Sequence, residues 1–317
     1  MIHTNLIASL LICLCSVPLV GQSIRTITVP DTSLSILVVG DWGRHGEHNQ
    51  RDVARAMDSA AVHLDPVAVV SVGDNFYPDG VQSVHDHAWK VSFEDIYTAH
   101  SLHVPWIVAL GNHDYHGNVQ AQIDYTDVSR RWTMPARYFD TTFVEDEDDA
   151  SVSVLLLVID TNPFQTDYLA APAGEYGDVA TQDTSRQKRY IDSVLTSSKA
   201  TWKIVIGHHP MYTGGKRKGK TGDMLRSFKG LFAKHRVDAY FAGHEHDLQH
   251  HVDDTGVHSF VSGAGSEVRK TGNIPETRFA RSVPGFATVT ASPTLLTVRF
   301  VDATGSVIYT TSIPKRR

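Results

Sequence analysis

The sequence predicts an α/β protein in which mostly parallel strands alternate with helices. Short runs of apolar, often β-branched residues recur along the chain, and several are apolar at successive positions, as in strands buried on both faces. Stretches with helical periodicity lie between these runs. A repeated order of strand, helix and strand is typical of a parallel α/β sheet.

The elements follow in order along the chain. Core strands are expected at 35–39, 66–72, 104–110, 152–159, 202–206 and 239–242, and helices at 49–64, 185–197 and 222–235. After residue 249 the pattern changes to alternating strands with turn residues between them, at 286–291, 295–301 and 307–313, which predicts an antiparallel addition to the same core. We interpret the acidic stretch 145–149 as a solvated hairpin tip. No repeat or long linker divides residues 22–317, so we expect one domain.

The composition excludes several classes of protein. The 317 residues include 29 Lys+Arg and 35 Asp+Glu, so no basic excess is present to bind a nucleic-acid backbone. A hydrophobic share of 41% with 20% charged residues is typical of a soluble globular protein. The 18 histidines outnumber the 12 phenylalanines and the 11 tyrosines. Because histidine is the commonest metal ligand, this excess suggests metal chemistry.

The first residues predict a signal peptide at 1–21. Residues 6–20 are almost uninterrupted apolar, which fits a secretory segment and is short for a membrane span. We expect a secreted or periplasmic protein with no span in its mature form, and the alternatives are a retained anchor or a buried first strand. Both cysteines, Cys13 and Cys15, lie in this segment. A mature protein without disulfides must be stabilised by its core or by bound metal.

At five places a predicted strand runs into glycine followed by polar, potentially metal-binding residues. The five blocks are Gly40-Asp41-Trp42-Gly43, Gly73-Asp74-Asn75-Phe76-Tyr77, Gly111-Asn112-His113-Asp114, Gly207-His208-His209-Pro210 and Gly243-His244-Glu245-His246. Ligands of open α/β sheets bind beyond the carboxyl ends of the strands, and glycine lets a chain turn sharply there. One such block alone would more often be a turn or a cap, but five at the same end of the sheet predict a convergent site.

In this order the five blocks resemble the metallophosphoesterase superfamily, and specifically the purple acid phosphatases of the small, tartrate-resistant type. Trp42 and Gly43 follow Asp41 where most relatives have a histidine, and Tyr77 stands three residues after Asp74, as in the purple enzymes. The segment 239–265 resembles the small type. The resemblance implies a four-layer αββα sandwich, in which two mixed sheets carry helices on both outer faces.

The resemblance also implies a binuclear metal centre with seven ligands. Asp41, Tyr77 and His246 would bind Fe(III), Asp74 would bridge the two ions, and a divalent Fe, Zn or Mn ion would be bound by Asn112, His208 and His244. Phenolate and carboxylate oxygens suit Fe(III), whereas an amide oxygen and imidazoles suit the divalent ion. A phenolate on Fe(III) would give the family's purple colour.

The implied activity is hydrolysis of phosphate monoesters at acid pH, by in-line attack of a metal-bound hydroxide on phosphorus. His113 would assist the leaving group, and Asn112 and His209 would contact the substrate. We expect small phosphorylated substrates, no nucleic-acid partner and a monomer. The alternatives are a phosphodiesterase or a nucleotide or pyrophosphate hydrolase with the same metals, and a catalytically silent binding module.

Some residues near the blocks have two interpretations. Asp114 either orients His113 or caps the local turn. Small mammalian-like relatives have another histidine in the loop 213–220, where this chain has four cations that either steer phosphate or belong to a solvated loop. Asp160 is interpreted as structural. Other histidines are interpreted as surface groups or as neighbours of the ligands: His45, His48, His116, His250 and His251.

Overall fold

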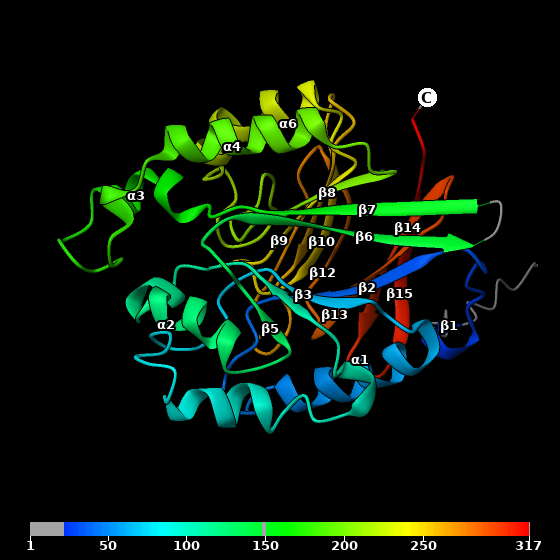
Figure 1. The fold of residues 1–317 in the computed structure, drawn as a ribbon, viewed down its shortest axis with the longest axis horizontal. Coiled ribbons are helices and arrows are strands. Elements are labelled where there is room, and N and C mark those ends of the chain that lie inside the picture. The colour runs from blue at the N-terminus through cyan, green and yellow to red at the C-terminus, as the bar shows by residue number, and fades with distance from the viewer. Residues whose placement is uncertain (1–21, 148–149, 317) are drawn as a thin grey trace, which may run out of the picture.

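Two mixed β-sheets packed face to face form the centre of the computed structural model, which describes residues 22–147 and 150–316. Helix α1 covers the outer face of one sheet, and helices α4 and α6 cover the outer face of the other (Figure 1). This is the expected four-layer arrangement. The predicted signal peptide, residues 1–21, lies outside the described residues.

The first sheet has the strand order β1-β15-β14-β13-β2-β3-β4-β5. Its parallel half consists of β2 (Leu34–Val39), β3 (Ala68–Ser71), β4 (Trp106–Val108) and β5 (Trp132–Thr133). Its antiparallel half consists of β13 (Gly285–Ala291), β14 (Leu295–Asp302), β15 (Ser306–Pro314) and β1 (Gln22–Ser23). Strand β13 pairs with β2, so the C-terminal strands extend the same sheet, as expected.

The second sheet has the order β12-β10-β11-β9-β8-β7-β6. Strands β7 (Ala150–Val158), β8 (Trp202–Ile206), β9 (Ala239–Ala242) and β11 (His258–Ser262) are parallel, whereas β6 (Phe139–Glu147), β10 (Leu248–Val252) and β12 (Thr277–Arg281) run antiparallel to their neighbours. Strand β6 ends at Glu147, which pairs with Ala150, so residues 145–147 of the predicted acidic tip belong to the β6–β7 hairpin, and residues 148–149 lie outside the described residues.

Each main helix follows the predicted range closely. Helix α1 (Gln50–Leu64) ends at Asp65, whose left-handed backbone lets its N–H donate to the Ala61 carbonyl. Helix α4 (Thr184–Ser197) begins after Asp183, which accepts a hydrogen bond from the Arg186 N–H. The helix expected at 222–235 is divided into α5 (Gly222–Met224), a π-helical turn (Leu225–Lys229) and α6 (Gly230–Lys234).

Shorter helical segments connect these elements. Helices α2 (Val119–Asp124) and α3 (Thr166–Leu169) precede and follow the β6–β7 hairpin, and a π-helical segment covers Trp89–Glu94. Single 3-10 turns lie at Ile24–Thr26, His100–Leu102, Asp114–His116, Tyr125–Asp127, Asn162–Phe164 and Val179–Thr181. In the part of the chain that the structure describes, no helix is both long and apolar enough to cross a membrane.

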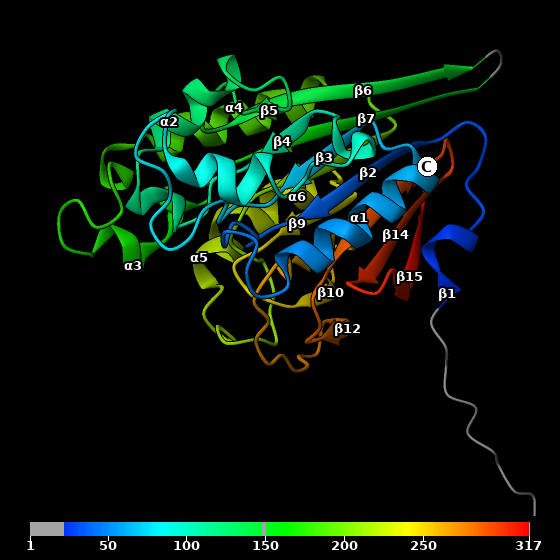
Figure 2. The same cartoon turned by 90° about the horizontal axis from the view of Figure 1, so that it is seen from below.

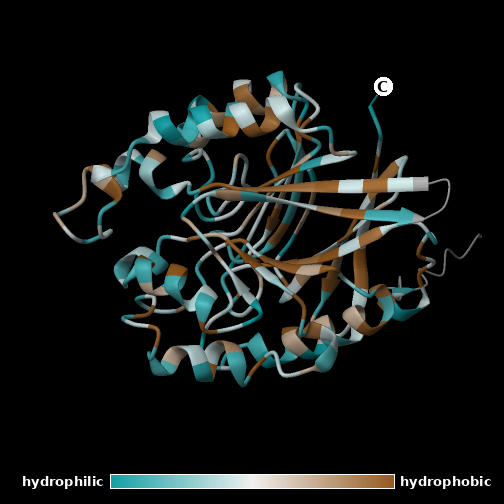
Figure 3. Ribbon diagram, in the orientation of Figure 1, coloured by the Kyte–Doolittle hydropathy of each residue, from teal (hydrophilic) through white to brown (hydrophobic). Residues whose placement is uncertain are grey.

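The central strands contribute side chains to two separate cores. In β7, Val154 and Leu156 pack in the core between the sheets, whereas Leu155 and Leu157 pack in a second core with Ile191 of α4. Figure 2 shows α1 lying across the opposite side, against the first sheet, and Figure 3 shows that the central strands are the most hydrophobic elements. Burial on both faces explains why these strands are apolar at successive positions.

Candidate metal centre

The ligand-type side chains meet just beyond the ends of β2, β3, β4, β8 and β9. Three of them have a left-handed backbone, Asp41 (φ 58°), Asp74 (φ 50°) and His244 (φ 70°). This conformation is uncommon outside glycine, and such strain is typical of functional sites. The sharp turns therefore lie in the proposed ligand residues themselves, and at the second block also in the preceding glycine, Gly73 (φ 90°), as the sequence predicted.

The glycines of the blocks are needed chiefly because the strand ends approach closely. A Cβ atom at Gly243 would lie 2.3 Å from Oδ2 of Asp41, and one at Gly111 would lie 2.2 Å from the backbone nitrogen of Asp74. Contacts this short do not occur for real Cβ atoms. Any larger residue would push the ligand-bearing loops apart.

A first group of ligand atoms surrounds the hydroxyl of Tyr77. Its oxygen lies 3.0 Å from Oδ1 of Asp41, 2.9 Å from Oδ2 of Asp74 and 3.1 Å from Nε2 of His246. All four side chains are buried. The structure therefore brings together the residues expected for the ferric ion.

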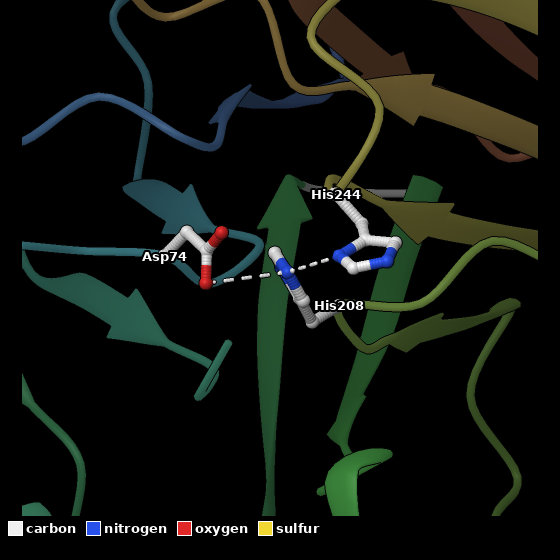
Figure 4. Close-up of side chains that lie close together, drawn as sticks. All are labelled: Asp74, His208 and His244. Atoms are coloured by element: carbon white, nitrogen blue, oxygen red, sulfur yellow. Dashed lines mark hydrogen bonds and ion pairs between the residues drawn. The ribbon is translucent and has the colours of Figure 1, made fainter. Parts of the chain in front are cut away.

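A second group surrounds Nε2 of His208. This atom lies 3.3 Å from Oδ1 of Asp74, 3.3 Å from Oδ1 of Asn112 and 3.1 Å from Nδ1 of His244. Figure 4 shows His208 between Asp74 and His244. The two carboxylate oxygens of Asp74 therefore face different groups, so this side chain is placed to serve both.

The donor atoms present fit metal ions. The Tyr77 hydroxyl carries one proton but lies within hydrogen-bond distance of two carboxylate oxygens, so it cannot donate fully to both. Nδ1 of His208 lies 2.9 Å from the Val72 carbonyl, to which it donates, so Nε2 is the ring nitrogen that faces the oxygens of Asp74 and Asn112. A histidine fixed by a backbone carbonyl in this way is typical of metal ligands.

Comparisons with known proteins decide the family. Residues 34–248 match the calcineurin-like phosphoesterase family. The chain is 35% identical over 294 residues to purple acid phosphatase 4 of Arabidopsis thaliana, an alignment that covers 88% of this chain and 83% of the relative. It is 32% identical over 306 residues to human tartrate-resistant acid phosphatase type 5, covering 90% and 92% respectively. The chain belongs to the purple acid phosphatases.

Solved structures share the fold of this purple acid phosphatase. GAP50, described as the anchor in the inner membrane complex of Plasmodium, has a TM-score of 0.79 at 23% identity and covers 90% of both chains. The purple acid phosphatase PPD1 of yellow lupin has a TM-score of 0.65 at 16% identity, covering 90% of this chain and 54% of its own. At these identities the likeness shows the fold alone.

Burial and charge determine the protonation of the phosphatase centre. Burial raises the pKa of Asp74, but His208 and His113 outweigh burial and hold this pKa well below its usual range. Burial lowers the pKa of His208, but Asp74, together with Asp41 and the Val72 carbonyl, outweighs burial and raises this pKa to about 9. Burial, with Asp41 and Asp74, raises the pKa of Tyr77 well above its usual range. Without cations Tyr77 and His208 therefore keep their protons, and metal binding must release them.

His113 lies at the edge of the centre. Its backbone N–H donates to Oδ1 of Asp74 (2.9 Å), and its Nδ1 lies 2.5 Å from the Pro78 carbonyl. Its Nε2 lies 4.0 Å from Oδ2 of Asp74, and 30% of the side chain is exposed. Nδ1–H is therefore committed to the backbone, and Nε2 faces the metal ligands.

Two neighbouring carboxylates have structural roles. Asp114 accepts hydrogen bonds from the N–H groups of Asn75 (3.0 Å) and Gly111 (2.8 Å) and from the Gln122 side chain (2.8 Å), and no described hydrogen bond joins it to the His113 ring. Of the two interpretations of Asp114, capping of the turn is the one that the structure shows. Asp160 accepts from the N–H of Asn162 (3.0 Å), so its structural interpretation is confirmed.

A cavity of about 210 Å³ opens beside Asn112 and His244. His209 lies in its wall, but both ring nitrogens are already hydrogen-bonded, Nδ1 to the Thr161 hydroxyl (2.7 Å) and Nε2 to the Tyr168 hydroxyl (2.8 Å). Tyr168 stacks on Tyr176, with ring centroids 4.1 Å apart, and both rings line the cavity. Sequence reasoning missed both tyrosines, because the segment 165–180 carries no motif.

Arg44 is a further residue that sequence reasoning missed. Its guanidinium lies 3.7 Å above the ring of Tyr77 and forms an ion pair with Glu267 at 2.9 Å. Its position directly after the first block was the only sequence signal. A cation over the face of a ring is attracted by the ring's π electrons, so Arg44 is placed to act on the electron density of Tyr77.

Proposed function

We propose that this protein is an acid phosphatase that hydrolyses phosphate monoesters at a binuclear metal centre. The observation that carries the proposal is the pair of ligand groups that share Asp74, one on each carboxylate oxygen. Purple acid phosphatases hydrolyse phosphate monoesters at a binuclear centre containing iron, and this chain is similar to them over most of its length.

Each group has a proposed ion. Asp41, Tyr77 and His246 would hold Fe(III), Asn112, His208 and His244 would hold a divalent Fe, Zn or Mn ion, and Asp74 would contribute to both sites. Two bound ions supply Lewis acidity toward the phosphate oxygens and lower the pKa of water. Two carboxylates and one phenolate do not neutralise such a pair of ions, so the centre attracts a phosphate dianion.

His113 is proposed to protonate the leaving alkoxide. Its Nδ1–H is held by the Pro78 carbonyl, so the proton it can transfer is the one on Nε2, on the side of the metal ligands. Asn112 and His209 stay the proposed substrate-side residues, because both line the cavity. His209 contributes by fixing the position of Tyr168.

Export, the single domain and the monomeric state belong to the same proposal. The apolar run 6–20 supports export by the first 21 residues. A single domain over 22–317 is supported by the pairing of β1 with β15, which joins the two ends of the described chain in one sheet. The cavity volume suits small phosphorylated molecules.

Metal analysis and hydrolysis assays test the proposal together. The purified protein should contain iron and a divalent metal, be purple, and hydrolyse 4-nitrophenyl phosphate at acid pH faster than bis(4-nitrophenyl) phosphate. Asp74→Asn should lose the two metals and the activity. Asp127→Asn, at an exposed position, should keep the metals and the activity. A colourless, iron-free preparation with full activity, or a preference for the diester, would refute it.

A further inference from the structure

The structure separates the four cations of the loop 213–220. Lys216, Lys218 and Lys220 are exposed, and Nζ of Lys218 donates to the Asn273 carbonyl at 3.0 Å. Arg217 is half-buried and lines the cavity together with Asn112 and His244. Lys220 also lines this cavity, so two of the four cations belong to the site and Arg217 is the half-buried one. Neither sequence interpretation describes the loop as a whole.

The loop that carries Arg217 is held in place by a buried carboxylate. Glu245 is fully buried, and its two oxygens accept the N–H groups of Lys216 and Arg217, both at 2.8 Å. A Cβ atom at Gly215 would lie 2.3 Å from Oε2 of Glu245, so the loop passes tightly over this carboxylate. The backbone around Arg217 is therefore fixed before any substrate binds.

The guanidinium of Arg217 is fixed as well. Its Nη1 donates to the carbonyl oxygen of His244 at 2.9 Å and lies 3.7 Å from Oε1 of Glu245. His244 is itself a proposed metal ligand, so the guanidinium lies directly beside the divalent-ion group. Among the described residues no hydrogen bond or ion pair involves Nε or Nη2 of Arg217. These donors are left for a ligand in the cavity.

We propose that Arg217 is a catalytic residue that binds the non-bridging oxygens of the substrate phosphate through Nε and Nη2. A guanidinium presents its donors in a fixed fork that matches two phosphate oxygens, and an ammonium group does not. Because Arg217 is fixed in advance, it stabilises the negative charge on these oxygens without reorganising. The inference rests on the proposed function, since it assigns a residue to that same site.

The test compares Arg217→Gln and Arg217→Lys with the wild type, all as the metal-loaded protein. With 4-nitrophenyl phosphate, Arg217→Gln should lose about 100-fold in kcat/KM, the order of loss seen when one stabilising donor is removed. Arg217→Lys should recover only part of this loss. Inorganic phosphate should bind Arg217→Gln about tenfold more weakly, the loss expected for a charge-assisted hydrogen bond. Lys218→Gln removes a cation from the same loop and should retain wild-type kinetics.

Two readouts separate this role from a merely structural one. Iron content and the visible spectrum of Arg217→Gln should equal those of the wild type. If iron is lost in proportion to activity, Arg217 acts by holding His244 and the inference is wrong. The inference is also wrong if kcat/KM and the phosphate affinity of Arg217→Gln both stay within about twofold of the wild-type values.

Phosphate binding can be followed through the visible spectrum without turnover, which distinguishes the two proposals. A wild-type protein that hydrolyses no monoester refutes the proposed function, whatever Arg217 does. If phosphate then binds equally to the wild type and to Arg217→Gln, the inference fails too. If phosphate binds Arg217→Gln more weakly than it binds the wild type, the inference about phosphate binding by Arg217 holds although the proposed function does not.

Discussion

A buried histidine of β10 should weaken the protein at acid pH. His250 is 1% exposed and stacks on Phe260, with ring centroids 4.3 Å apart. Its Nδ1 hydrogen-bonds the Tyr309 hydroxyl (2.8 Å), and its Nε2 hydrogen-bonds Nδ1 of His258 (3.0 Å). Burial, together with His258, lowers the pKa of His250 from 6.5 to about 3. The folded protein therefore keeps this imidazole neutral where the unfolded chain protonates it.

The size of the effect follows from the two pKa values. Above pH 6.5 the imidazole is neutral in both states and contributes no pH dependence. As the pH falls below 6.5, only the unfolded state binds the proton, so the free energy of unfolding drops by about 1.4 kcal/mol per pH unit until the folded pKa is reached. At about pH 4.5 this residue alone should cost about 2.7 kcal/mol.

The substitution His250→Phe tests this reasoning. It keeps a ring against Phe260 but loses two hydrogen bonds, so it should lower stability at about pH 7.5 by about 1–2 kcal/mol. The fall in stability between about pH 7.5 and about pH 4.5 should nevertheless shrink by about 2.7 kcal/mol relative to the wild type. Urea unfolding of both metal-loaded proteins at the two pH values measures this difference.

A matched control is Tyr309→Phe, which removes the hydroxyl partner of His250 but keeps the titrating imidazole. It should lower stability at both pH values and keep the wild-type pH dependence. An equal pH dependence in His250→Phe and the wild type would refute the reasoning, because a neutral buried His250 could not then be the source of the acid instability.

Three further predictions concern the metal centre and the core beneath it. Tyr77→Phe should lose the visible absorption, and an unaltered spectrum would reject Tyr77 as a ligand. Arg44→Met should keep its iron but shift this absorption to longer wavelength, because no cation then lies 3.7 Å over the phenolate ring, and an unshifted band would contradict the cation–π contact. Trp42→Ala removes a fully buried side chain whose indole N–H donates to Ser71, so it should lower the free energy of unfolding by about 3–5 kcal/mol in a denaturant titration, and a loss below about 1 kcal/mol would contradict its core role.

The sequence was sufficient to predict that the proposed ligand residues lie together, because each of them follows a buried strand. Parallel strands have their carboxyl ends at one edge, so residues as distant as Asp41 and His246 could be expected together. The β7, β8 and β9 ranges were predicted well for the related reason that burial on both faces leaves a continuous apolar run.

The strands β10 and β12 were missed because their sequences are rich in polar residues. His250 and His251 of β10 were interpreted as surface groups or neighbours of the ligands, yet both are buried. Strand β10 pairs with β11 on one side and β12 on the other, and this pairing depends on contacts distant in sequence. Local patterns do not report such contacts. The cavity wall made by Tyr168 and Tyr176 was missed for the same reason.

The close approach of the strand ends bears on how relatives without activity would be recognised. The glycines before Asp41, Asp74 and His244 are crowded by different neighbours: a Cβ atom would lie 2.4 Å from the Val72 side chain at Gly40, 2.8 Å from the Gly111 backbone nitrogen at Gly73 and 2.3 Å from Oδ2 of Asp41 at Gly243. A descendant that lost its ligands would still need the glycines at 40 and 73 in order to fold, whereas the one at 243 would be released from its contact with Asp41. Glycines kept at strand ends without the acidic, phenolic and imidazole residues after them would therefore mark shared ancestry, and only the residues that follow them would mark an enzyme.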